Sequence, residues 1–169
     1  RAPRVFFVGA LVAMLFGANI AFAFDFDDVA ALARRKARAA YQPPDRRQPA
    51  ELELLGYDRY RDIRFRPDRA IWRADGAPFD LMFFHRAQSN PRVRMNEVVD
   101  GEARHIPYDS ADFDFGKNTL SPEKWGEVDY AGVRVHYHLN GPEYKDELIV
   151  FLGASYFRAL AAGTRYGLS

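Results

Sequence analysis

Closely spaced turn signals are the feature of this chain that most constrains its fold. From about residue 57 onward, the apolar runs are interrupted by short clusters of glycine, proline and aspartate or asparagine, namely RPDR (66–69), DGAP (75–78), DG (100–101) and NGPEY (140–144). Segments this short suit strands rather than the helices of alternating βαβ units. The sequence therefore predicts a mainly β domain, either a sandwich or a barrel.

The runs between these turns are predicted to be strands. They cover residues 62–67, 78–86, 92–99, 102–108, 113–116, 131–140 and 146–153. The pair Asp100-Gly101 can adopt the positive φ that a tight hairpin turn requires. Apolar and polar residues alternate along 131–140, which is typical of a strand with one polar face. The run 146–153 is almost continuously apolar, so we expect it to be buried on both faces.

One helix is predicted ahead of the strands, over residues 25–42. Asp25 or Asp27 can cap its first turn, because a short acidic side chain accepts hydrogen bonds from free backbone amides. Four basic residues in its second half complement the negative end of the helix dipole. The prolines of residues 42–49 end the helix, since proline lacks a backbone donor and clashes with the preceding turn.

Residues 1–23 have the composition of a secretory signal peptide. Arg1 and Arg4 form a basic start, an uncharged apolar stretch follows, and Ala-Phe-Ala matches the small-x-small pattern for cleavage before Phe24. The alternative is a membrane-spanning helix, because the apolar stretch is nearly long enough to span. The acidic FDFDD that follows argues against that alternative. Export by the general secretory or the twin-arginine route stays open.

Charge and composition exclude one class of function and one source of stability. The chain has 24 basic and 23 acidic residues; removing the two leader arginines leaves 22 against 23, a net charge of −1. A near-neutral domain is not expected to bind nucleic acid through its phosphates. There are no cysteines, so a core rich in aromatics, which are 15% of residues, must supply stability without disulfides. Because the sequence starts at Arg1 and stops at Ser169 inside predicted structure, we expect it to be part of a longer protein.

Two histidines are candidates for a metal site. His136 and His138 lie two residues apart on the predicted polar face of one strand, where two imidazoles can reach one ion. His85 and His105 could add ligands, but their spacing does not tie them to this pair. Strict alternation already explains both positions, so we favour polar residues on the solvent-facing side of a strand and predict no metal.

Other candidates for chemistry are the aspartates of the YDSADFDFG segment and one serine. Asp109, Asp112 and Asp114 could provide one of the two carboxyl groups that a glycosidase needs, or could belong to a solvated turn, which we favour. Ser155 lacks the second glycine of a nucleophile elbow and is interpreted as a cap or turn hydroxyl. Residues 155–163 are expected to form a turn or short helical bend. No phosphate-binding glycine motif occurs in the sequence, and no cofactor is predicted.

Several blocks, taken together, resemble one family. They are FDFDDVAALARRKA (24–37), LGYDRYRDIRFRPDRAIWR (55–73), PFDLMFFHR (78–86), MNEVVDG (95–101), HIPYDSADFDFG (105–116) and FLGASYFRALAAGTRYGLS (151–169). In this order they are similar to the MdoG/OpgG/OpgD family of periplasmic glucan biosynthesis proteins. The resemblance covers essentially all of residues 24–169 and is most specific in the last block.

The resemblance implies a fold and a place in the cell. It implies a large N-terminal β-sandwich similar to galactose mutarotase, of which residues 24–169 would be the front part, followed by a smaller immunoglobulin-like domain that this sequence lacks. It also implies export to the periplasm of Gram-negative bacteria and a role in making osmoregulated periplasmic glucans, which have a β-1,2-linked glucose backbone.

The resemblance also implies candidate residues for glucan binding. The catalytic acid and water-positioning residues of hydrolytic family members would lie beyond Ser169, so no catalytic residue is predicted here. The residues of the family's marked blocks that could contact glucan are Trp72, Tyr156, Phe157, Arg158 and Tyr166. Aromatic rings can stack on glucose, and the arginine can bind hydroxyls. Core packing with a structural arginine is the alternative, because aromatics supply much of the core area in such domains.

Three functions remain open from the sequence. Some members of the family are inverting endo-β-1,2-glucanases, so the protein is expected to bind β-1,2-glucan, and hydrolysis of that glucan is an open function. The alternative is a non-catalytic scaffold that binds glucan or a partner of the membrane glucan synthase. An unrelated exported β-sandwich adhesin is the third reading.

Overall fold

The computed structural model describes residues 23–86, 91–153 and 155–164. The described part is mainly β, as predicted, and all its strand pairs are antiparallel. The helices are α1 (Phe26–Arg38), α2 (Ala50–Glu53) and α3 (Tyr57–Arg61), with short 3₁₀ turns at Pro67–Arg69, Ser110–Asp112 and Pro122–Lys124. The strands are β1 (Arg64–Phe65), β2 (Asp80–Phe84), β3 (Met95–Val99), β4 (Glu102–Ile106), β5 (Phe113–Asp114), β6 (Gly132–Tyr137), β7 (Asp146–Leu152) and β8 (Tyr156–Ala159).

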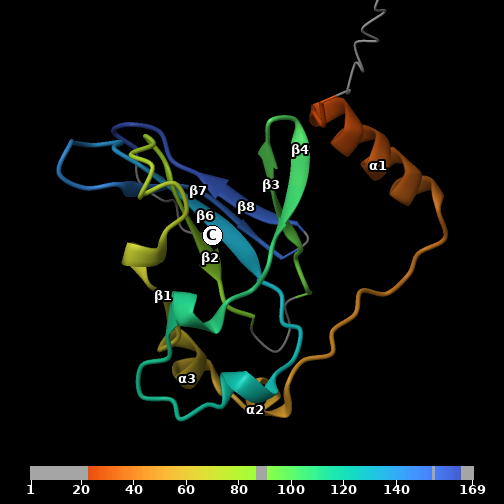
Figure 1. The fold of residues 1–169 in the computed structure, drawn as a ribbon, viewed down its shortest axis with the longest axis vertical. Helices are drawn as coiled ribbons and strands as arrows, with labels where there is room; N and C mark the ends of the chain where they lie inside the picture. The colour runs from red at the N-terminus through yellow and green to blue at the C-terminus, as the bar shows by residue number, and fades with distance from the viewer. Residues whose placement is uncertain (1–22, 87–90, 154, 165–169) are drawn as a thin grey trace, which may run out of the picture.

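A four-stranded sheet in the order β2-β6-β7-β8 forms the centre of the molecule (Figure 1). Its register pairs Asp80 with His136, and Arg134 with Val150, which in turn pairs with Arg158. A β-bulge between Val135 and His136 shifts the β6–β7 pairing by one residue. Bulges of this kind re-aim side chains, and this one lies beside the cleft described below.

Two smaller ribbons accompany the central sheet. β1 pairs with β5, and β3 pairs with β4 in the hairpin predicted from Asp100-Gly101. Both turn residues have positive φ, 52° and 81°, as a tight hairpin turn requires. The tip of this hairpin accepts a hydrogen bond from the Phe24 amide, which places α1 next to it (Figure 1).

The helix α1 confirms the predicted cap but is shorter than predicted. The Asp25 carboxylate accepts hydrogen bonds from the amides of Asp27 and Asp28, and the Asp28 carboxylate accepts one from the Asp25 amide. The helix ends at Arg38 instead of residue 42, because Ala39 is already extended (φ −79°, ψ 156°). No residue of α1 is buried, so the helix is stabilised mainly by its caps.

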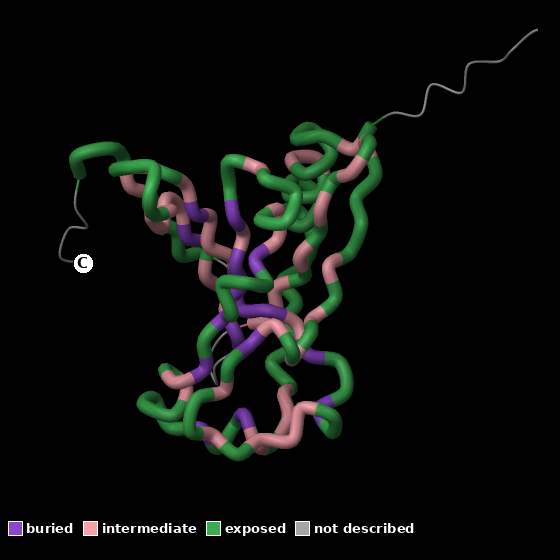
Figure 2. The backbone as a smooth tube through the Cα atoms, turned by 60° about the vertical axis from the view of Figure 1, so that its left-hand side comes forward, coloured by how far each residue is buried: buried purple, intermediate pink, exposed green. Residues whose placement is uncertain are grey.

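The core lies between the central sheet and the short elements below it (Figure 2). Phe65, Phe83, Phe113 and Tyr130 are buried there and contact one another through their rings. The other buried members are Leu52, Leu55, Ile63, Ala70, Met82, Trp125 and Val128. The aromatic residues noted in the sequence therefore supply much of the buried area of this core.

Two expectations about the C-terminal part of the described chain were wrong. In β7 only Val150 is buried, and Phe151 keeps 49% of its surface exposed, so the strand is not buried on both faces. Residues 156–159 form strand β8 instead of a helical bend. Gly153, with φ 63°, makes the turn that folds this segment back along β7, and pairing with β7 then determines its conformation.

The predicted signal peptide lies outside the described residues, apart from Ala23. Among the helices of the described ranges, none has the length and apolar composition needed to cross a membrane.

Candidate functional site

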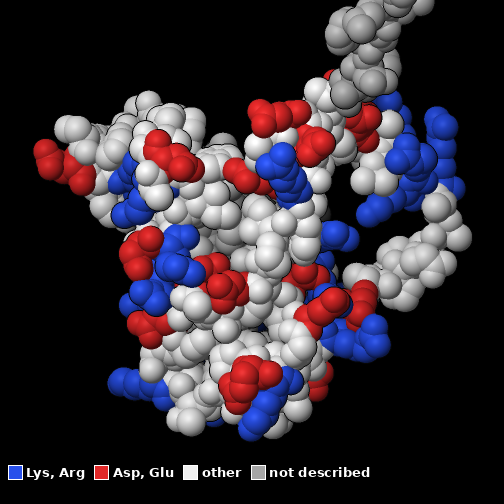
Figure 3. All heavy atoms as spheres, viewed as in Figure 1, with Lys and Arg blue, Asp and Glu red and all other residues white. Residues whose placement is uncertain are grey.

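A cleft of about 630 Å³ opens on one face of the central sheet. Its floor comprises Asp80 and Met82 of β2 and Arg134 and His136 of β6. One wall is formed by Arg64, Phe65 and Pro67, and the others by Arg73 and by His138 with Glu143–Lys145 of the β6–β7 turn. Acidic and basic side chains are interspersed over most of the surface seen in Figure 3, and basic side chains gather on α1.

The alternation of β6 explains why polar groups reach this floor. Arg134 and His136 point to one face of the strand, whereas Val133 and Val135 point to the other. The register sets Met82 opposite Arg134 and Asp80 opposite His136. The sequence pattern over 131–140 thus predicted the shared face, although it did not identify Arg134 as a functional candidate.

The carboxylate of Asp80, at one end of the cleft, is paired with two cationic side chains. Its side chain is 1% exposed, and it accepts hydrogen bonds from Lys145 Nζ at 2.7 Å and Arg73 Nη2 at 2.6 Å. Burial acts to raise the pKa of Asp80, but the bond from Lys145 and the charge of Arg73 outweigh it, and the pKa is lowered. Asp80 is therefore ionised and paired, and is unsuited to donate a proton as a general acid.

His136 and His138 are both fastened to the β6–β7 turn. Each donates from Nδ1 to a backbone carbonyl, His136 to Lys145 and His138 to Tyr144, both at 3.2 Å. His138 is exposed as expected, but His136 is only 8% exposed, because the turn covers it. The expectation of a solvent-facing His136 was therefore wrong. Within the described residues, no three His, Cys, Asp or Glu side chains are grouped closely enough to bind a metal.

Arg134 links the cleft to β7 and β8. Its guanidinium lies over the Phe84 ring, 4.3 Å from the centroid, and its Nη1 is 3.5 Å from Glu147 Oε2. Arg158 donates to the other oxygen of Glu147. Burial lowers the pKa of Arg134, opposed by the charge of Glu147. The Glu147 carboxylate of β7 thus lies between Arg134 of β6 and Arg158 of β8.

The structure places the predicted glucan-binding residues in separate positions, and none of the described ones lines this cleft. Trp72 has φ 69° and donates from its indole nitrogen to Glu97 of β3. Tyr156 and Phe157 are exposed on β8, and Phe157 stacks on Phe151 with ring centroids 6.4 Å apart. Arg158 is half-buried and reaches the cleft only through Glu147 and Arg134. Tyr166 lies outside the described residues.

Asp109 and Asp114 of the YDSADFDFG segment hold exposed turns, as expected, whereas Asp112 is partly buried and burial raises its pKa. Asp109 caps the 3₁₀ turn by accepting from the Ala111 amide, and Asp114 accepts from the Gly116 amide. Asp112 pairs with Arg69 at 3.2 Å. Ser155 lies in the turn between β7 and β8.

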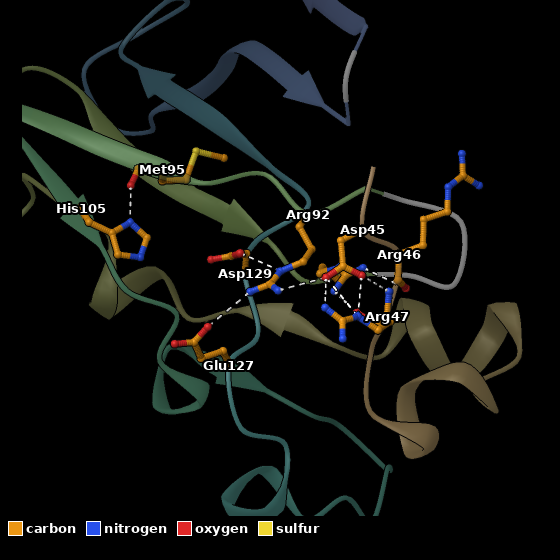
Figure 4. A network of polar contacts seen from close by, with 9 residues as sticks. Asp45, Arg46, Arg47, Arg92, Met95, His105, Glu127 and Asp129 are labelled. Atoms are coloured by element: carbon orange, nitrogen blue, oxygen red, sulfur yellow. Dashed lines mark hydrogen bonds and ion pairs between the residues drawn. The ribbon is translucent and has the colours of Figure 1, made fainter. Parts of the chain in front are cut away.

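A second polar network fastens the segment after α1 to the body of the domain (Figure 4). Arg92 contacts Asp129 at 2.9 Å and Asp45 at 3.7 Å. Hydrogen bonds from Arg47 lower the pKa of Asp45 well below its usual range. The buried Arg86 donates to the backbone carbonyls of Arg46 and Arg47. Arg47, Arg86 and Arg92 of this network are paired with carboxylates or backbone carbonyls. We therefore interpret the network as structural, since it holds residues 45–47 against the rest of the domain.

Comparisons with known proteins point to one family. A family model described as "Periplasmic glucan biosynthesis protein, MdoG" matches residues 24–169. The chain is 48% identical over 156 residues to "Glucans biosynthesis protein G" of Ralstonia nicotianae, covering 92% of this chain and 31% of that protein. It is 49% identical over 148 residues to the protein of that name from Rhodopseudomonas palustris, covering 86% of this chain and 29% of the relative. The corresponding protein of Vibrio cholerae is 45% identical over 147 residues, 86% of this chain and 27% of its own length. The chain thus spans less than a third of these curated relatives.

Proposed function

Because the chain belongs to the family of periplasmic glucan biosynthesis proteins, MdoG, we propose that the protein acts in periplasmic glucan biosynthesis by binding the β-1,2-linked glucan backbone. The match over residues 24–169 is the observation that carries this proposal. The cleft on the central sheet is the proposed binding site, since its walls combine apolar surface with hydrogen-bonding groups, as sugars require.

Two properties of the cleft suit a neutral sugar polymer. Its charged groups are largely paired internally, Asp80 with Lys145 and Arg73, and Arg134 with Glu147. A site of this kind offers polarised donors without a strong net field, so it favours hydroxyl-rich ligands over highly charged ones.

The aromatic residues of the family blocks would extend binding beyond the cleft. Tyr156 and Phe157 expose their rings on β8, and Trp72 is half-buried beside β3. We propose that Trp72, Tyr156, Phe157 and Tyr166 stack on glucose rings, and that Arg158 supports the cleft. Stacking of sugar C–H faces on aromatic rings would let a long polymer run across both regions.

We also propose the cellular location and the partners of the protein from its family membership. We propose that residues 1–23 direct export, that the protein works in the periplasm, and that it hands glucan to or from the membrane glucan synthase. Hydrolysis of β-1,2-glucan is the stronger form of the proposal, and its catalytic groups would lie outside this chain. A non-catalytic scaffold that binds glucan is the second candidate.

Incubation of the full-length protein with linear β-1,2-glucan separates these two candidates. A catalytic protein binds the polymer and releases shorter oligosaccharides, which chromatography detects. A scaffold binds the polymer and leaves its length unchanged even at high protein concentration. Absence of binding to β-1,2-glucan by the folded protein would contradict both.

A further inference from the structure

Two buried polar atoms on one face of β6 have no hydrogen-bond partner. They are Nε of Arg134 and Nε2 of His136, and both residues line the cleft. A buried donor or acceptor without a partner destabilises the fold, so such groups are rare in folded proteins outside functional sites. Two of them side by side on the floor of one cleft indicate a partner that arrives with the ligand.

The chemistry of the two atoms is complementary. His136 Nδ1 carries the proton, because it donates to the Lys145 carbonyl at 3.2 Å; the neutral ring therefore presents Nε2 as an acceptor. Arg134 Nε–H can only donate. The two residues are two positions apart on one strand face, roughly 7 Å between their Cα atoms. A hydroxyl group has the hydrogen-bonding capacity to serve both atoms, since it can accept one hydrogen bond and donate another.

Two groups hold the Arg134 guanidinium in place, and a third side chain orients one of them. Phe84 lies under its guanidinium, and Glu147 binds its Nη1 side. Arg158 fixes Glu147 through the other carboxylate oxygen. These contacts leave Nε of Arg134 without a partner, and they connect Arg158, which belongs to the FLGASYFR block, to the cleft floor.

We infer that Arg134 and His136 form a donor–acceptor pair that binds one hydroxyl of the saccharide, and that Arg158 is a positioning residue that acts on Arg134 through Glu147. The inference rests on the proposed function and adds the atoms that recognise the sugar. Because Nε2 is closed to solvent, the hydroxyl enters as the exposed β6–β7 turn, residues 140–144, moves aside and then closes over it.

Two substitutions of His136 separate recognition from support of the turn. In His136→Asn, the side-chain amide can replace Nδ1 and keep the bond to the Lys145 carbonyl, but the Nε2 acceptor is lost. In His136→Gln, the amide reaches the Nε2 position instead. We expect calorimetry of the full-length protein with a linear β-1,2-glucan oligosaccharide to show affinity reduced about 3- to 10-fold for Asn, and less for Gln.

His105→Asn is the matched control. His105 also donates from Nδ1 to a backbone carbonyl, that of Met95, but lies on β4 away from the cleft. It should keep wild-type affinity. Equal affinity of wild type and His136→Asn, both folded by melting temperature, would overturn the inference while leaving the proposed function intact. If His136→Gln bound glucan more weakly than His136→Asn, His136 would be assigned to support of the turn. That result would also overturn the inference. No binding by the wild type would instead refute the proposed function.

The role of Arg158 is tested by coupling. Arg158→Ala should weaken glucan binding about 3- to 10-fold, and Arg158→Lys should recover part of the loss by keeping a cation at Glu147. In an Arg134→Lys background, which already lacks Nε, Arg158→Ala should have little further effect. Arg104→Ala, on the exposed β3–β4 hairpin, should leave affinity unchanged. Additive losses for Arg158→Ala and Arg134→Lys would show that Arg158 does not act through Arg134.

Discussion

At the scale of single residues, hydrogen-bond partners decide which buried polar groups hold structure and which remain for a ligand. His85 illustrates the first kind: it is 3% exposed, and its Nε2 accepts a hydrogen bond from the Tyr108 hydroxyl at 2.9 Å. Its Nδ1 donates to the Arg86 carbonyl at 3.0 Å. Both ring nitrogens are used, in contrast to His136, so His85 belongs to the core rather than to a site.

The buried His85 predicts a pH dependence of stability. Burial lowers its pKa from 6.5 to about 4, so the folded state disfavours the protonated ring. Its contribution is complete above pH 6.5 and is lost as the pH falls toward 4, because the unfolded state then binds the proton more readily. The loss amounts to about 3 kcal/mol at most. Urea denaturation of wild type and His85→Phe between pH 7 and 4 should show a smaller pH slope for the variant; equal slopes would contradict this assignment.

Substitution of Trp72 is predicted to weaken glucan binding without a matching fall in melting temperature. The ring is half-buried, with one hydrogen bond to Glu97. If it stacks on glucose, Trp72→Ala in the full-length protein should weaken glucan binding and change the melting temperature little. A large fall in melting temperature with unchanged affinity of the folded fraction would assign the ring to structure instead.

At the scale of elements, strands β6 and β7 approach each other closely at Gly132. A Cβ at Gly132 would lie 2.1 Å from the backbone oxygen of Phe151, which no side-chain movement can relieve. The β6–β7 pair therefore requires glycine at position 132, which pairs with Leu152 at one end of the two strands.

The Gly132→Ala variant should lose about 3 kcal/mol of stability, because the added methyl group forces the two strands apart. Gly56→Ala is the matched control, since nothing lies within 4 Å of a Cβ there and its φ is negative. Thermal unfolding of both variants measures the difference. Equal melting temperatures for the two would show that the β6–β7 contact is looser than described.

Local pattern predicted much of this element structure. The alternation of 131–140 gave β6 and its polar face, and Asp100-Gly101 gave the hairpin, because turn chemistry and period are local properties. Strand β8 was missed, since its conformation depends on pairing with β7. The cleft itself was also missed: Asp80, Arg134 and Lys145 meet only through sheet register, which no spacing in the sequence encodes.

At the scale of the whole molecule, the described chain leaves apolar surface uncovered. Phe151 and Phe157 stack on each other at the surface, and β8 pairs on one side with β7. The curated relatives are more than three times as long as the matched region. In the full-length protein, further strands are expected to pair with the open edge of β8 and complete the sandwich.

Residues 24–169 alone are therefore predicted to unfold without a sharp transition. An open sheet edge and exposed aromatic rings favour association and loose packing. Calorimetry of this segment should give a broad, concentration-dependent transition, while the full-length protein melts cooperatively. A sharp two-state transition of the segment would contradict the prediction.

The most direct test of the central claim is the affinity of the full-length protein for a linear β-1,2-glucan oligosaccharide, measured by calorimetry beside a β-1,3-linked oligosaccharide of equal length. Our account predicts binding of the β-1,2-linked chain in preference to the β-1,3-linked one, with affinity reduced about 3- to 10-fold in His136→Asn. No binding of the β-1,2-linked chain by the folded protein would contradict it.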